Sequence, residues 1–243
     1  MPQYSIRPNA DVPFEIRHAD EDLLVVDKPS GVVTQPGKGH DRDSLLNALF
    51  CEHGNALQNM GDERTWGLLH RLDKDTSGLV IVALRTRAYA ALREQFESRH
   101  IRKRYWAIVA GLPVPAQAVI QLPIAEVTST RKIAVLRRDG KQAITAYKVL
   151  ASAPNVSLIE ARPKTGRLHQ IRVHMAARGH PLLGDDVYGK DADMPKVARL
   201  CLHAAELSFI HPSSGRRVTV QSPFPSDLTK ISRRLGLPVP AFD

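Results

Sequence analysis

The chain has 243 residues, of which 43% are hydrophobic, so it is long and apolar enough to bury a core and is not disordered as a whole. Lysine and arginine number 34 against 25 aspartate and glutamate residues, which gives a net charge of +9 and a pI near 9.8. This balance favours a polyanionic partner, although a merely basic, solvated surface explains the charge equally well.

The two cysteines, Cys51 and Cys201, do not form a Cys-x-x-Cys pair, so neither a disulfide framework nor a zinc site is expected. Both lie among apolar residues, and we expect reduced core thiols and a cytoplasmic protein. Residues 1–13 are polar and contain prolines, and no later run approaches the length of a membrane span. Secretion and membrane insertion are therefore not expected.

The predicted elements are strands separated by short turns, with helices between some of them. Strands are predicted at residues 23–26, 68–73, 79–84, 105–110, 131–136, 144–151, 156–161, 200–209 and 217–221. Helices are predicted from an Asp43 cap through residue 53, from a Thr86 cap through residue 99, and over 168–178 before Gly179. This order predicts an α+β fold: one domain on a mixed, largely antiparallel central sheet with flanking helices.

The motif His-Arg-Leu-Asp-Lys-Asp-Thr-Ser-Gly at 70–78 comes directly before an apolar run. If residues 68–73 form a strand, side chains alternate between its faces, so Arg71 and Asp73 share one face. Turn-forming residues follow, and Gly78 can take a positive φ. Asp73 is therefore expected on a rigid part of the fold, beside a loop. The alternative is a strand end whose aspartate caps its own turn and whose arginine is solvated.

Arg172 shares one side of the predicted third helix with Leu168 and Met175, so it lies along an apolar stripe. An arginine cannot lose its charge, and a partly buried one normally needs a carboxylate in a hydrogen-bonded fork. The alternative is an arginine whose stem covers apolar surface while its head reaches water. The residues alone favour neither interpretation.

Basic and aromatic residues are adjacent at 102–106, where Arg-Lys-Arg leads directly into Tyr105 and Trp106. This run combines cations that can neutralise phosphates with ring faces that can stack on an unpaired base. It therefore favours a nucleic acid as the polyanionic partner.

Together these segments resemble the RluA-type branch of the RNA pseudouridine synthases, in which His-Arg-Leu-Asp followed by Thr-Ser-Gly carries the catalytic aspartate. The matching segments occur in the family's order at 27–31, 70–78, 103–107, 166–174, 181–185 and 199–204. They extend from about Asp22 to about Pro223, and chance agreement at this many segments in order is not plausible. His70 separates this chain from the RsuA-type branch, which usually has glycine there.

The resemblance implies the family's fold, with an active cleft across a long central sheet, and isomerisation of uridines in ribosomal or transfer RNA to pseudouridine. It implies three catalytic residues: Asp73 as the catalytic aspartate, Arg172 as its ion-pair partner and Tyr105 against the flipped uracil. The expected substrate-binding residues are Arg71, which fills the vacated base stack, His70, Thr76 and Leu202. No cofactor or metal is expected, because the reaction involves no net redox change.

The expected organisation is an N-terminal extension at 1–20, a catalytic domain at 21–225 and a C-terminal segment at 226–243, in a monomer. No auxiliary RNA-binding domain is expected, because the first family-like strand begins near Asp22. Two other classes remain open. A metal-dependent nuclease or glycosidase would use Asp73 and Asp75, although neighbouring turn residues seldom share a metal. A catalytically silent RNA-binding module would not need Asp73 to pair with Arg172.

Overall fold

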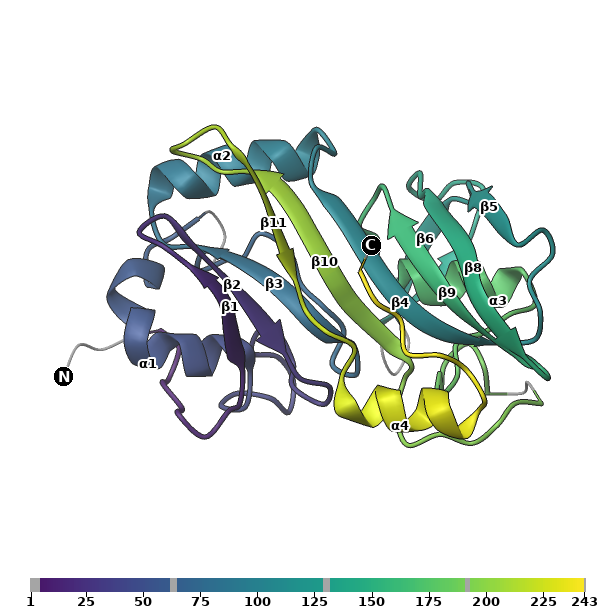
Figure 1. Ribbon diagram of the computed structural model, residues 1–243. Coiled ribbons are helices and arrows are strands. Elements are labelled where there is room, and N and C mark those ends of the chain that lie inside the picture. The colour runs from purple at the N-terminus through teal and green to yellow at the C-terminus, as the bar shows by residue number, and fades with distance from the viewer. Residues whose placement is uncertain (1–4, 62–64, 129–131, 191–192, 243) are drawn as a thin grey trace. The chain divides into compact units, whose positions relative to one another are not determined.

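The computed structural model describes residues 5–61, 65–128, 132–190 and 193–242 (Figure 1). It divides into two compact units. Unit 1 comprises Met1–Arg102 and Glu206–Ser222, and unit 2 comprises Lys103–Ala205 and Pro223–Asp243. In the described part of the chain, no helix has the length and apolarity needed to cross a membrane.

Unit 1 contains β-strands and two helices. Its elements are β1 (Glu15–Ala19), β2 (Leu23–Lys28), α1 (Leu45–Leu57), β3 (Ser77–Ala83), α2 (Thr86–Glu97), the second part of β10 (Leu202–Ile210) and β11 (Arg217–Gln221). β1 pairs with β2, β2 with β3, and β10 with β11, all antiparallel. Every residue of β3 is buried, which fits the apolar run that predicted it. Leu92 of α2 packs against this strand's Leu79 and Ile81.

Unit 2 contains a second set of antiparallel strands. Its elements are β4 (Arg102–Ala110), β5 (Gln117–Ile120), β6 (Ile124–Thr128), β7 (Lys132–Leu136), β8 (Thr145–Ala153), β9 (Val156–Pro163), α3 (Gln170–Ala177), the first part of β10, and α4 (Ser226–Arg234). The strand order is β10-β4-β9-β8-β5, and β6 and β7 form a separate hairpin. Trp106, Leu158 and Leu228 belong to the core of this unit.

The predicted α+β class with mostly antiparallel strands is confirmed, but the strand predicted at 68–73 is wrong. Leu68 forms one isolated bridge to Val82, and the following residues are irregular. The reason is visible at Leu72, whose N–H and C=O are both bonded to the Thr34 side chain and not to a neighbouring strand. Arg131, in the strand predicted at 131–136, lies outside the described residues; β7 begins at Lys132.

Both predicted helix caps are off by one residue. Ser44, not Asp43, caps α1 through a capping box in which the Ser44 and Asn47 side chains each accept from the other's backbone. Thr86 is the first residue of α2, and Arg85 precedes it without a side-chain cap. Cys51 is exposed, which corrects the expected core thiol, whereas Cys201 is buried, and burial raises its pKa to about 12.

Candidate active site

The backbone on both sides of Asp73 is fixed by the segment that follows β2. Thr34 Oγ1 donates to Leu72 O at 2.8 Å and accepts from Leu72 N at 3.1 Å. Gly31 N donates to Lys74 O at 2.9 Å. Residues 28–34 therefore clamp the chain on either side of Asp73, whose side chain is half-buried.

Lys28 is the centre of this clamp. Its side chain is fully buried, and Nζ donates to the carbonyls of Pro29 at 2.9 Å, Val32 at 2.6 Å and Lys74 at 3.1 Å. An ammonium has three N–H donors, so these three acceptors match its capacity. Lys28 lies opposite Gly78 in the β2–β3 ladder, and Gly78 has φ +115° as expected for this turn. The clamp thus ties the loop of Asp73 directly to the sheet.

The other motif residues of unit 1 lie around this loop. Arg71 is exposed. His70 Nε2 accepts from Ile81 N at 3.2 Å, and its ring lies 5.2 Å from the Phe96 ring. Thr76 N donates to Asp73 O at 3.1 Å, which closes the turn after the aspartate. The Thr76 hydroxyl is buried and has no hydrogen-bond partner among the described residues.

Arg172 of α3 is buried in unit 2, and its side chain is only 7% exposed, so the interpretation of an arginine that reaches water is wrong. Its guanidinium forms the expected fork with a carboxylate, and that carboxylate is Asp185. Nε lies 2.8 Å from Oδ2, and Nη2 lies 2.9 Å from Oδ1. Burial raises the pKa of Asp185, but the hydrogen bond and charge of Arg172 outweigh it and lower that pKa overall. The pairing of Arg172 with Asp73, a residue of the other unit, stays a prediction.

A buried chain of hydrogen bonds fixes α3. His174 Nε2 lies 3.0 Å from Leu122 O, so this nitrogen must carry the proton, and Nδ1 accepts from Thr145 Oγ1 at 2.9 Å. Thr145 in turn accepts from Gln170 Nε2 at 2.9 Å, and Gln170 Oε1 accepts from the Thr165 hydroxyl at 2.6 Å. This arrangement requires neutral His174, and burial lowers its pKa accordingly. Each turn of α3 is therefore anchored beside Arg172.

Tyr105 and Leu202, the remaining predicted site residues, are buried at 9% and 4% exposure in β4 and β10 of unit 2. The expectation that Trp106 offers a ring face to an RNA base is wrong. Trp106 is only 1% exposed and packs on the Phe224 and Phe242 rings, so it is a core residue. Burial lowers the pKa of Lys103 to about 8, and its Nζ donates to a backbone carbonyl at 3.3 Å. Strand alternation directs the side chains of Tyr105 and Trp106 to opposite faces of β4.

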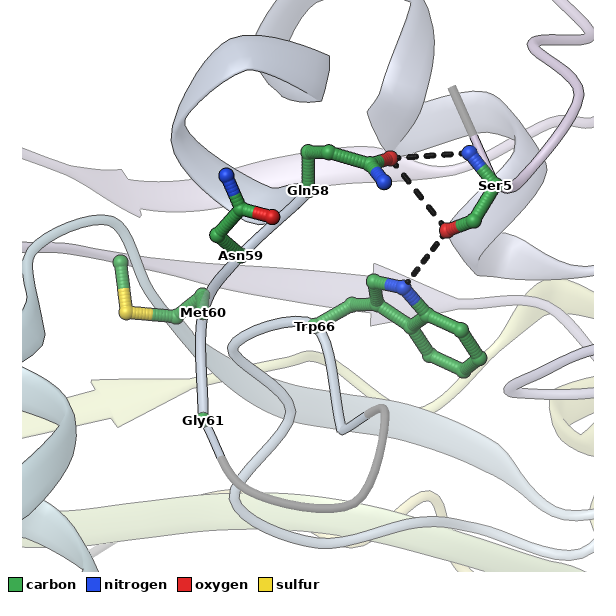
Figure 2. A pocket seen from close by; sticks show the side chains of 6 residues that line it. All are labelled: Ser5, Gln58, Asn59, Met60, Gly61 and Trp66. Carbon is green, nitrogen blue, oxygen red and sulfur yellow. Dashed lines mark hydrogen bonds between the residues drawn. The ribbon is translucent and has the colours of Figure 1, made fainter. Parts of the chain in front are cut away.

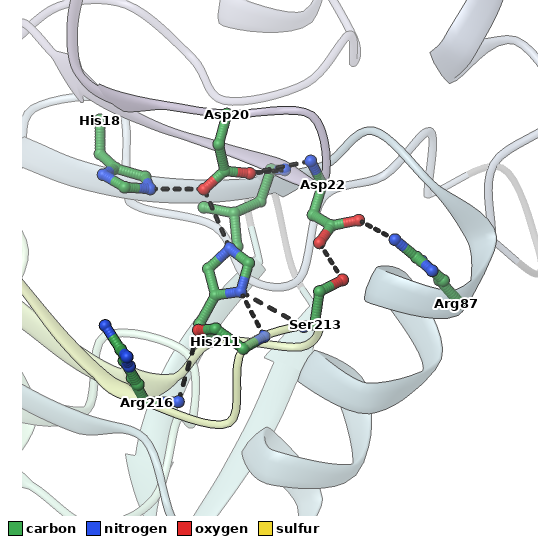
Figure 3. A network of polar contacts seen from close by, with 9 residues as sticks. His18, Asp20, Asp22, Arg87, His211, Ser213 and Arg216 are labelled. Atoms are coloured by element: carbon green, nitrogen blue, oxygen red, sulfur yellow. Dashed lines mark hydrogen bonds and ion pairs between the residues drawn. The ribbon is translucent and has the colours of Figure 1, made fainter.

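A polar network in unit 1 brings two histidines to one carboxylate, as Figure 3 shows. Asp20 Oδ2 lies 2.7 Å from His18 Nε2 and 3.0 Å from His211 Nε2. His211 Nδ1 accepts the N–H groups of Ser213 and Ser214, which places the ring proton on Nε2. A protonated Nε2 cannot ligate a metal, so the grouping of Asp20, Asp22 and His211 is better explained as a cross-link between two turns. Burial raises the pKa of Asp20, but hydrogen bonds from backbone and histidines lower it to about 2.

A shallow pocket in unit 1 is lined by Ser5, Gln58, Asn59, Met60, Gly61 and Trp66 (Figure 2). Gln58 Oε1 accepts from both N and Oγ of Ser5, and Trp66 Nε1 donates to Ser5 Oγ at 3.1 Å. No titratable side chain is among these lining residues, so they offer no acid or base, and the Ser5 hydroxyl is hydrogen-bonded to Gln58 and Trp66. It does not contribute to the candidate active site.

Comparison with known proteins decides the family. The family model described as RNA pseudouridylate synthase matches residues 22–177, which is more than half of the chain. The chain belongs to this family. The resemblance stated from the motifs is confirmed, and the RNA pseudouridylate synthase family consists of isomerases that act on RNA.

Two relatives and one solved structure show the extent of the similarity. The ribosomal large subunit pseudouridine synthase D of Zymomonas mobilis is 41% identical, over 97% of this chain and 77% of the relative. The protein of the same name from Xanthomonas campestris is 36% identical, over 93% of this chain and 70% of the relative. The structure of human RNA pseudouridylate synthase domain containing 4 superposes with a TM-score of 0.74 at 26% identity, over 93% and 95% of the two chains.

Proposed function

We propose that this pseudouridine synthase acts on ribosomal RNA and that Asp73 is its catalytic carboxylate. The RNA class is supported by the two relatives named ribosomal large subunit pseudouridine synthase D. The clamp is the observation that supports a catalytic role for Asp73. It holds the backbone on both sides of this residue, while the side chain stays half-buried. A carboxylate that must be aimed at one atom needs such a rigid mount.

The reaction breaks the bond between uracil N1 and ribose C1′, turns the base, and rejoins it through C5. The target base must first leave its stack, which costs a few kcal/mol that binding contacts must offset. Asp73 then either attacks C1′ or removes the C2′ proton to give a glycal. Arg172 pairs with this carboxylate and holds it aimed at the sugar. Both routes use the same ionised oxygen.

The other residues act on the substrate. Exposed Arg71 fills the space that the flipped base leaves, and Tyr105 and Leu202 contact the extruded uracil. His70 and Thr76 line the binding surface next to the loop of Asp73. Residues 21–225 form the catalytic domain between an extension at 1–20 and a segment at 226–243. The enzyme is a cytoplasmic monomer that needs neither metal nor cofactor.

Tritium release from RNA labelled with 5-³H-uridine tests this proposal, because rejoining through C5 expels the hydrogen on that carbon. We expect release from large-subunit ribosomal RNA and none from a transfer RNA pool. A carbodiimide primer-extension map in cells with and without the gene then locates the uridine. Tight RNA binding without tritium release from either RNA would favour the silent binding module.

A further inference from the structure

The buried environment of Arg172 contains an acidic residue with no assigned function. We propose that Asp185 is the positioning residue that holds Arg172 in its reactive orientation, an inference that rests on the proposed function. The Asp185 side chain is fully buried, whereas the neighbouring Asp186 side chain is 71% exposed and lies 3.8 Å from Arg172 Nη2. Of these two adjacent carboxylates, only Asp185 is buried against the guanidinium.

The fork fixes the guanidinium because the carboxylate is itself fixed. Asp185 Oδ1 accepts Arg172 Nη2 at 2.9 Å and also the backbone N–H groups of Val187 and Tyr188, each at 3.0 Å. Its Oδ2 accepts Arg172 Nε at 2.8 Å. A planar fork of this kind sets both the position and the plane of the guanidinium.

The Tyr188 ring also contacts the Arg172 guanidinium. Arg172 Cζ lies 5.4 Å from the centre of the Tyr188 ring, within the range of a cation–π contact. The Tyr188 hydroxyl is anchored to both N and O of Ala134 in β7, at 2.9 and 3.0 Å, and lies 2.9 Å from His169 Nδ1. The guanidinium is therefore held between a carboxylate and a ring, each tied to backbone.

This geometry has a consequence for the reaction. The fork uses two of the five N–H donors of Arg172. An ion pair needs a short distance and a fixed orientation, so a guanidinium that can turn away no longer aligns the carboxylate that it pairs with. Without Asp185, Arg172 should lose its fixed orientation and the chemical step should slow.

The test compares Asp185→Asn with Asp186→Asn, which removes the same charge from the next residue. For Asp185→Asn we expect kcat for tritium release to fall about 10- to 100-fold, the loss typical of a misplaced reacting group. We expect KM for RNA to change little, because the fork is buried. Asp186→Asn should match the unmutated enzyme in both kcat and KM.

A purely stabilising role would lower the melting temperature of Asp185→Asn while leaving kcat below the unfolding transition unchanged, and that result would overturn the inference. If Asp185→Asn does not fold, Tyr188→Phe replaces it, because it keeps the ring but removes the anchoring hydroxyl. It should lower kcat by less than Asp185→Asn, with KM little changed, and an unchanged kcat would again refute positioning.

The ¹⁵Nε resonance of Arg172, assigned by loss in Arg172→Lys, tests the fork without any turnover. We expect slow exchange about the Cζ–Nε bond in the unmutated protein and fast exchange in Asp185→Asn. Equal exchange in both would overturn the inference even in an active enzyme. An unmutated protein that releases no tritium would instead overturn the proposed function, and with it the catalytic half of this inference.

Discussion

Replacing Lys28 by methionine should unfold the clamp around Asp73. The substitution keeps most of the apolar stem but removes the donors to the carbonyls of Pro29, Val32 and Lys74. Lys74 O keeps its bond from Gly31 N, so two part-buried acceptors, the Pro29 and Val32 carbonyls, lose a donor, at about 1–3 kcal/mol each. Relief from burying a charge offsets part of this sum, and we expect a net loss of about 2–4 kcal/mol.

Urea unfolding measures this loss, and Lys74→Met is the matched control because its side chain is exposed and only its backbone carbonyl belongs to the clamp. The control should stay within about 0.5 kcal/mol of the unmutated protein. Tritium release by Lys28→Met, measured below its unfolding transition, should also fall. Equal unfolding midpoints for the two variants would refute the reasoning that the buried ammonium fixes the loop.

Three further predictions follow from the same structure. Because burial lowers the pKa of His174, the unfolded chain takes up a proton below about pH 6.5 that the folded chain does not, so stability should fall as pH drops. His174→Gln should flatten this slope in urea titrations between pH 5 and 7, and exposed His100→Gln should not. Arg71→Ala should slow tritium release from structured RNA more than from a flexible loop, and equal losses would argue against a role in base flipping. Turnover should survive EDTA; activity that disappears and returns with Mg²⁺, on RNA shown to stay folded, would contradict the metal-free mechanism.

The fold class was predictable because hydrophobic patterns and turn residues directly reflect burial. The apolar run in β3 and the positive φ of Gly78 could be inferred from local sequence. The segment 68–73 could not, since its backbone partner is the Thr34 side chain, a contact between residues 38 positions apart. β1 was missed because its mostly exposed residues show no alternation of polar and apolar side chains.

In the candidate site too, local sequence predicted some features and not others. The apolar stripe of α3 correctly required a carboxylate for Arg172, but no local signal identifies Asp185, which lies 13 residues away across a turn. A buried Arg-acid fork is a property of the folded chain. Trp106 was misassigned for the opposite reason, because adjacency to basic residues says nothing about which face of a strand is covered. The burial of Lys28 was the hardest feature to predict, since a lysine is seldom expected in a core.

The most direct test of the central claim is tritium release by Asp73→Asn, compared with Asp75→Asn in the same loop. Asparagine keeps the size of the side chain but removes the anionic oxygen that either route requires. We expect Asp73→Asn to release no tritium while its RNA affinity changes little, because phosphate contacts elsewhere supply much of the binding. Asp75, which is exposed, should tolerate the same change with its activity retained. Tritium release by a folded Asp73→Asn protein would contradict the assignment of the catalytic carboxylate.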